Sequence, residues 1–246
     1  MTASRLMKKT NDKRRRTFNN RSSPTATIKS LPKDMLVEVV ARVASHSITD
    51  LHNMKMCCAD FLDAADDNHV WRHVSLDKLP LIQWFPNDKA LSFLKRCRES
   101  GNTESLYREG LQEYFSYPKG NIRGLESLKM AAEKGHTDAK YMYGMILLCS
   151  EDNELRTQGL EHMRFLRKSK CIIRCRKNVV QTAKFRWKNN GTLACKPTPL
   201  CHDKNTCKGW SVKKGQWLLL NDDDDDIELC EYCRWDHEIE FFLSVI

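Results

Sequence analysis

The apolar residues of the stretch 31–76 are spaced for two consecutive helices. They recur every three or four positions, which is the period of one helix face. The two stripes are Leu36, Val39, Val40 and Val43, then Leu51, Met54, Cys58, Phe61 and Leu62. Pro32 suits a first helical turn, and Asp34 lies where a carboxylate complements a helix N-terminus. So short a module buries too little of its surface to be very stable alone, and we expect apolar side chains to be left for a partner to cover.

An ordered set of residues in this stretch resembles an F-box. The set is Leu31-Pro32, Asp34-x-Leu36-x-Glu38, Asp50-Leu51, Cys57-Cys58-x-x-Phe61 and Val70-Trp71. The resemblance implies docking on a Skp-family adaptor, through it on a cullin of a ubiquitin ligase, and selection of a protein substrate by the rest of the chain. The side chains expected to bind the adaptor are Leu31, Pro32, Leu36, Val39, Val40, Val43, Leu51, Met54 and Trp71.

An internal repeat follows. Ser105-x-Tyr107-x-x-Gly110 reappears 34 positions later as Ala139-x-Tyr141-x-x-Gly144, and Gly124-Leu125-Glu126 reappears as Gly159-Leu160-Glu161. A period of this length is typical of helix-turn-helix solenoids. The segment 124–139 resembles tetratricopeptide-like repeats of the Sel type, in which such a surface binds peptides; a spacer between ligase and substrate is the alternative. Two units are fewer than a freestanding array needs, so we expect them to lean on their neighbours.

Cysteines and histidines gather near the C-terminus, at Cys195, Cys201, His202, Cys207, Cys230, Cys233 and His237. A C-x-x-C pair lets two thiolates reach one zinc ion, and Cys201 with Cys207 supplies a second pair. We therefore predict a small zinc-ribbon-like element with one structural zinc held by Cys201, Cys207, Cys230 and Cys233, and with hairpin strands at 209–210 and 216–220. His202 or His237 could replace a cysteine, Cys195 could replace Cys201, and ordinary buried cysteines are the alternative.

The charge is divided unevenly along the chain. Residues 1–33 hold ten Lys and Arg against one Asp, and residues 162–202 hold eleven against no acid. Within the first block, residues 1–29 are a disordered basic tail on composition. The cluster Lys8, Lys9, Lys13, Arg14, Arg15 and Arg16 in this tail resembles a nuclear import signal. Within 164–188, basic residues alternate with Phe185 and Trp187, so a nuclear zinc-containing nucleic-acid-binding protein is the alternative function. The acidic run 222–226 could instead neutralise this stretch within the chain, which makes nucleic acid an unlikely partner.

The remaining composition supports a mainly α protein without membrane spans. No apolar run approaches the ~18 residues that a span needs, and the N-terminus lacks the apolar region of a signal peptide, so we expect a nuclear or cytoplasmic protein. No nucleophile-base pair or phosphate-binding loop is present at meaningful spacing, which indicates a non-catalytic subunit. The expected domains are a tail at 1–29, an F-box at 30–76, helical repeats at 77–170 and a basic, cysteine-rich region at 171–246. The tail Cys230-x-x-Cys233-x-Trp235-x-His237-Glu238 is similar to that of a small group of plant F-box proteins.

Overall fold

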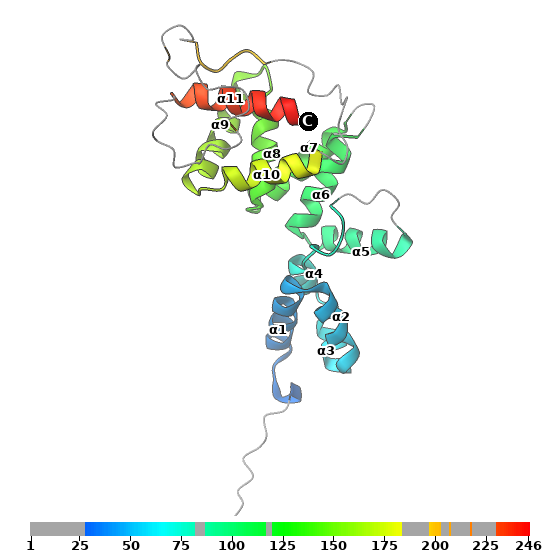
Figure 1. Cartoon of the computed structure of the whole chain (residues 1–246). Helices are drawn as coiled ribbons and strands as arrows, with labels where there is room; N and C mark the ends of the chain where they lie inside the picture. Colours follow the sequence, from blue (N-terminus) through cyan, green and yellow to red (C-terminus); the bar gives the residue numbers. More distant parts are fainter. Residues whose placement is uncertain are drawn as a thin grey trace, which may run out of the picture.

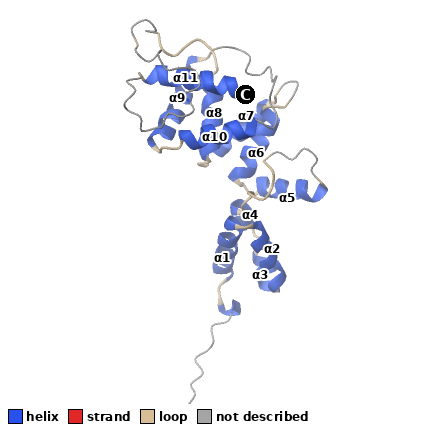
Figure 2. Cartoon of the chain, viewed as in Figure 1, coloured by secondary structure: helices blue, strands red, loops and turns tan. Residues whose placement is uncertain are grey.

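The computed structural model of the chain describes residues 28–81, 87–116, 120–183, 197–202, 207, 217 and 230–246. Within these ranges all regular structure is helical (Figures 1 and 2), which confirms the mainly α class. The helices are α1 (Lys33–His46), α2 (Ile48–Cys57), α3 (Ala59–Ala64), α4 (Asn68–His73), α5 (Asp88–Glu99), α6 (Thr103–Tyr114), α7 (Ile122–Glu133), α8 (Thr137–Leu148), α9 (Asn153–Lys168), α10 (Ile172–Ala183) and α11 (Glu231–Val245), after a 3-10 turn at Ile28–Ser30. Among the described helices, none combines the length and the apolar character that crossing a bilayer requires.

Helices α1 to α4 form a small module at one end of the molecule, with α1 beside α2 and α3 (Figure 1). Its core is apolar, with Val40, Ala44 and Val70 fully buried. Ser47 ends α1 and caps α2, because its hydroxyl accepts a hydrogen bond from the backbone N–H of Asp50 at 3.1 Å. The core is small, so part of the apolar surface of its helices stays outside it.

Helix α5 joins this module to the repeats. The buried side chain of Asn102 donates hydrogen bonds to the carbonyls of Trp71 (3.2 Å) and Val74 (3.0 Å), and its oxygen caps α6. Arg72 donates to the carbonyl of Ser100 at 3.1 Å. The end of the first module is therefore hydrogen-bonded directly to the first corner of the repeat array.

The two predicted repeat units are the pairs α6/α7 and α8/α9. In each pair the helices cross at glycines, and a Cβ on Gly159 would lie 2.9 Å from the carbonyl oxygen of Gly144. A Cβ on Gly110 would lie 2.8 Å from the Cγ of Leu128. These contacts are closer than real Cβ atoms make, so the recurring glycines are the positions at which the paired helices touch.

The turns that precede α6, α8 and α10, here called corners, share one backbone geometry. Residues 101, 135 and 170 all have positive φ, at 81°, 94° and 55°. At each corner the next residue donates back to the carbonyl five positions earlier, as Asn102 does to Cys97, His136 to Ala131 and Cys171 to Leu166. This is the Schellman ending of a helix. Glycine stands at the first two corners, and Lys170 holds the same conformation at the third.

A third helix pair extends the array beyond the two predicted units. Helix α10 follows the third corner, and its partner α11 comes from the far end of the chain. Both pack against α8 (Figure 1). Trp235 and Phe242 of α11 are fully buried in the repeat core. Helix α8 is covered on every side as a result, with all residues from Tyr141 to Leu148 buried. The C-terminal helix thus supplies the neighbour that the short array needs.

Candidate docking surface and metal centre

The residues expected to bind the adaptor divide between core and surface. The structure buries four of them in the core of the first module and leaves two half-buried, while three remain exposed. The buried residues are Leu36, Val40, Leu51 and Trp71, the half-buried ones are Val43 and Met54, and the exposed ones are Leu31, Pro32 and Val39. The buried set shapes the module, and only the exposed set is available to a partner without rearrangement.

Three exposed apolar residues, here called the stripe, are Leu31, which precedes α1, and Met35 and Val39 within it. Leu31, Met35 and Val39 are 44%, 56% and 46% exposed, and they recur at every fourth position. Met35 and Val39 lie on one face of α1, because they are four positions apart in the helix. Met35 was absent from the sequence-based set, although this spacing was readable in the sequence. Met56 of α2 (76% exposed) and Leu62 of α3 (52%) add apolar surface on the neighbouring helices.

Trp71 is not part of this surface, because α5 covers it. Its ring meets that of Phe93 edge-on, with 5.4 Å between the centroids. The guanidinium of Arg96 lies 4.4 Å from the centroid of the same ring. Arg96 also binds Asp66, with 3.0 Å between its nitrogen and the carboxylate. The tryptophan at the end of the first module therefore anchors α5.

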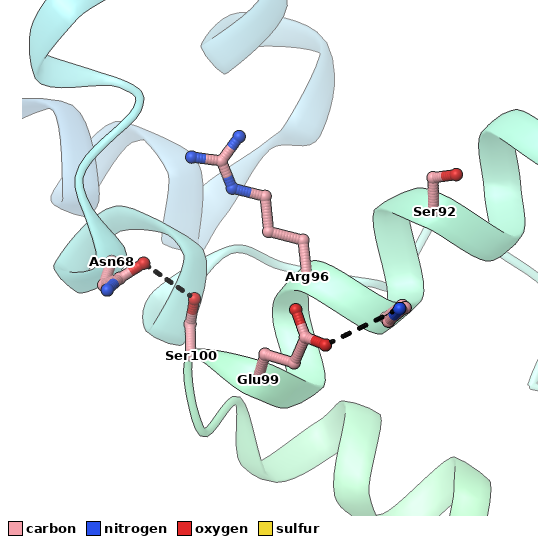
Figure 3. Close-up of a pocket in the computed structure, with 6 residues that line it drawn as sticks. Asn68, Ser92, Arg96, Glu99 and Ser100 are labelled. Atoms are coloured by element: carbon pink, nitrogen blue, oxygen red, sulfur yellow. Dashed lines mark hydrogen bonds and ion pairs between the residues drawn. The ribbon is translucent and has the colours of Figure 1, made fainter.

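A polar hollow of about 530 Å³ marks this joint (Figure 3). Asn68 of α4 faces Ser100 at the end of α5, with 3.4 Å between their side-chain oxygens. Lys95 and Glu99 pair on α5 at 3.9 Å. Asn68 and Ser100 are thus bonded across the joint and Lys95 and Glu99 within α5, so we assign the hollow a structural role.

Four cysteines that are distant in the sequence converge on one point. The sulfur atoms of Cys201, Cys207, Cys230 and Cys233 all lie within 4.8 Å of one another. Those of Cys201 and Cys230 are 3.8 Å apart. A tetrahedral zinc ion with Zn–S bonds of ~2.3 Å requires sulfurs ~3.8 Å apart. The donor set and its spacing fit one tetrahedral ion that prefers thiolates, and the four thiols could hold a metal ion.

Helix α11 holds this group in place. Cys230 caps the helix, and its sulfur accepts a hydrogen bond from the backbone N–H of Cys233 at 3.2 Å. One turn later the carboxylate of Asp236 accepts from the backbone N–H groups of Leu200 (2.7 Å) and Cys201 (2.9 Å). The helix start favours negative charge on the Cys230 sulfur, because the free N–H groups there carry partial positive charge. One helix thus supplies two of the sulfurs and fixes the loop that carries a third.

The other candidate ligands are placed differently. His202 is exposed beside the group, and the ring of His237 lies against that of Trp217, with 5.3 Å between the centroids. Cys195 lies outside the described residues, as do the predicted strands at 209–210 and 216–220 except for the buried Trp217. Burial raises the pKa of Cys97 and of Cys149 to about 12, and these thiols are packing residues of the core.

A buried ion pair joins α11 to α10, and it was not predicted from the sequence. Glu238 of α11 is fully buried and accepts from Arg176 of α10, with a shortest distance of 2.7 Å. The hydroxyl of Tyr141 also donates to this carboxylate, as does the indole N–H of Trp217 at 2.7 Å. Burial, followed by the nearby Glu238 charge, raises the pKa of Tyr141 and keeps its hydroxyl protonated. The pair locks α11 onto α8 and α10.

The sequence contained a signal for this pair. Tyr107 and Tyr141 are 34 positions apart, and Arg176 follows 35 positions later, so it occupies the place of the repeated tyrosine in a third unit. A buried cation at that place requires a buried acid nearby. Glu238 is that acid.

The basic stretch 164–188 is partly neutralised inside the molecule. Arg164 of α9 forms a bidentate salt bridge with the carboxylate of Glu231 of α11, with N···O distances of 2.6 and 2.9 Å. Arg176 is buried against Glu238. Residues 184–188, with the two aromatics that could stack on bases, lie outside the described residues. The nucleic-acid alternative therefore loses two of its cations to ion pairs within the fold.

Comparison with known proteins agrees with this architecture. Residues 76–184 match the family model "Plant tetratrico peptide repeats". The chain is 31% identical over 122 residues to "F-box protein At2g35280" of Arabidopsis thaliana, an alignment that covers 50% of this chain and 74% of that protein. The chain belongs to the F-box proteins. Another Arabidopsis relative, "Putative F-box protein At1g67623", is 35% identical over 130 residues, which is 53% of this chain and 43% of that relative. No solved structure matches this F-box protein.

The family assignment agrees with the resemblances noted in the sequence, a plant F-box protein with helical repeats. This F-box protein spans less than half the length of the At1g67623 relative. We propose that the F-box is the module α1–α4, whose residues carry the resemblance noted in the sequence. The matched repeat region begins at residue 76, after α4, and extends through α10.

Proposed function

We propose that this protein is the substrate-recognition subunit of an SCF-type cullin-RING ubiquitin ligase. Its F-box docks on a Skp-family adaptor, and the repeat and C-terminal regions bind a target protein. The subunit itself is non-catalytic and acts by raising the concentration of the target near the ubiquitin-loaded enzyme. The observation that carries the proposal is the exposed stripe Leu31, Met35 and Val39 on a module whose core is otherwise complete.

The size of the apolar surface decides how far the docking interface must reach. Fully burying one such side chain contributes ~1.5 to 3 kcal/mol, and each of the three is already about half buried. The stripe alone therefore contributes ~2 to 4.5 kcal/mol, which offsets at most the low end of an association cost of ~4 to 15 kcal/mol. Met56 and Leu62 lie on α2 and α3, which contact α1, and Lys33 at the start of α1 pairs with Asp63 of α3 at 2.7 Å. We expect the adaptor to cover these residues as well.

The test separates docking from folding. Met35→Asp with Val39→Asp places two charges on the exposed stripe and should abolish capture by immobilised adaptor, while the circular dichroism spectrum stays unchanged. The matched control is Leu91→Asp with Met130→Asp, two residues of similar exposure on α5 and α7. Capture that survives the first pair, or falls equally with the second, contradicts the proposal. Leu36→Asp would be uninformative, because it places a charge in the core.

We further propose that the four cysteines hold one structural zinc ion, since four thiolates in a tetrahedron suit zinc. Bound zinc would tie the loop at Cys201 to the start of α11, and a structural site of this kind contributes ~10 to 16 kcal/mol in small zinc-binding peptides. Nuclear import through Lys8, Lys9 and the cluster 13–16 remains a prediction, because these residues lie outside the described ranges. A fluorescent fusion of residues 1–29 tests it, and an even cellular distribution would contradict it.

A further inference from the structure

The outer face of α10 carries cations and no acid. Arg174, Lys177 and Gln181 are exposed, while Ile172 and Val179 face the core. Arg174 and Lys177 form no ion pair with any described residue. Like charges three positions apart on a helix destabilise it by ~0.2 to 0.5 kcal/mol. An acidic partner would relieve this repulsion.

A hollow of about 460 Å³ adjoins this face, at the corner where α6 and α8 begin. Lys134 and Arg174 lie in its wall, as do Thr103 and Thr137, the first residues of α6 and α8. Both helices turn the positive ends of their dipoles toward it. The cationic region therefore extends from the outer face of α10 across to the corner between the repeat units.

The acidic side chains at this hollow are hydrogen-bonded to neighbouring residues, except for one oxygen of Asp138, Oδ1, which has no partner among the described residues. Asp138 accepts a hydrogen bond from the amide of Asn178 at 2.9 Å. His136, also in the wall, binds Glu104 of α6 at 2.7 Å. The acids of α11 are used elsewhere, since Glu231 binds Arg164 and Glu238 binds Arg176. Among the described side chains at this hollow and on the adjoining face of α10, the cations Lys134, Arg174 and Lys177 therefore outnumber the one carboxylate without a cationic partner, that of Asp138.

We propose that Lys134, Arg174 and Lys177, with the hollow between α6, α8 and α10, bind an acidic segment of the target protein. The inference rests on the proposed function and names its substrate class. A peptide fits better than a nucleic acid because the exposed residues of α10 include no aromatic side chain on which a base could stack.

The experiment uses the full chain bound to its adaptor and a fluorescein-labelled decaglutamate peptide as probe. Lys134→Glu, Arg174→Glu and Lys177→Glu together should weaken peptide binding at least tenfold, measured by fluorescence anisotropy. The control is Lys78→Glu, Lys89→Glu and Arg123→Glu, which makes the same change in net charge at three exposed positions elsewhere. The control variant should bind the peptide within threefold of the wild type.

Three results would overturn the inference. The wild type could fail to bind the peptide, the two variants could lose binding equally, or a thymidine dodecamer could bind more tightly than the peptide and be lost only in the first variant. Adaptor binding is measured in parallel. Its absence in the wild type would defeat the proposed ligase function, whereas its retention in the first variant shows that a loss of peptide binding is local.

Discussion

The N-terminal module and the C-terminal region differ in how far the chain buries their apolar and charged side chains. The F-box has a small apolar core and leaves Met35 and Val39 on the outside, whereas α8 and α11 are sealed together around a buried ion pair. Under the proposed function, the adaptor covers the apolar side chains that the F-box leaves exposed. The C-terminal region supplies its own cover, using α11 as the last helix of the array. An apolar helix face that the rest of the chain leaves exposed is therefore a candidate docking surface.

The largest expected effect concerns the four cysteines, which under the zinc proposal tie the loop at Cys201 to the start of α11. Cys230→Ser with Cys233→Ser removes two sulfurs of the group, so the protein should lose its metal and α11 should become sensitive to limited proteolysis. Elemental analysis should find one zinc per chain in the wild type and none in the variant. The control is Cys57→Ser with Cys58→Ser, in the F-box and outside the group. A wild type without metal would refute the zinc assignment.

The buried ion pair should show the next largest effect. Arg176→Met leaves Glu238 charged and buried, which costs ~3 to 5 kcal/mol of unfolding free energy. Adding Glu238→Gln should recover much of that loss, since the amide still accepts from Trp217. Urea denaturation measures both. Arg98→Met, which breaks the exposed pair with Glu109, should cost less than ~1 kcal/mol. If Arg176→Met and Arg98→Met lowered the free energy of unfolding equally, the buried pair of Arg176 and Glu238 would not stabilise the fold as described.

Acid should weaken the repeat array through Glu104. Burial raises the pKa of this carboxyl, but its bonds to His136 and Arg108 outweigh burial and hold the pKa below the ordinary 4.5. A depressed pKa stabilises the fold above the unfolded value, and the contribution is lost as pH falls through the folded value. Glu104→Gln should therefore reduce the loss of stability between pH 5 and pH 3, measured by thermal unfolding. An unchanged pH profile would show that the carboxylate does not join α6 to α8.

The smallest effect separates the third corner from the first two. Lys170 has φ of 55°, a region where a side chain costs ~1 to 2 kcal/mol and glycine does not. Glycine loses more entropy on folding, so Lys170→Gly should raise stability by no more than ~1 kcal/mol. Gly135→Ala should lower it, although a Cβ there meets no atom within 4 Å, because its φ of 94° is strained for alanine. Opposite signs in calorimetry are expected, and a stabilising Gly135→Ala would refute the strain argument.

Sequence reasoning recovered the local features and missed those that depend on distant residues. Helix periods, the glycines 144 and 159 and the four cysteines were readable, because each follows from spacing along the chain. The sequence did not show which of the expected docking residues are buried and which are exposed. Helix α1 has apolar residues on two faces, and its packing against α4 decides that Val40 is buried and Val39 exposed. The third repeat unit was missed because its second helix lies beyond residues 184–229.

The central claim is that the F-box stripe binds a Skp-family adaptor through apolar contact. Calorimetric titration of the full chain with purified adaptor at 50 mM and at 500 mM salt tests it most directly. Apolar burial gives a negative heat-capacity change and little dependence on salt, so we predict dissociation constants that agree within threefold. No binding at either salt concentration, or affinity that falls steeply with salt, would contradict the claim.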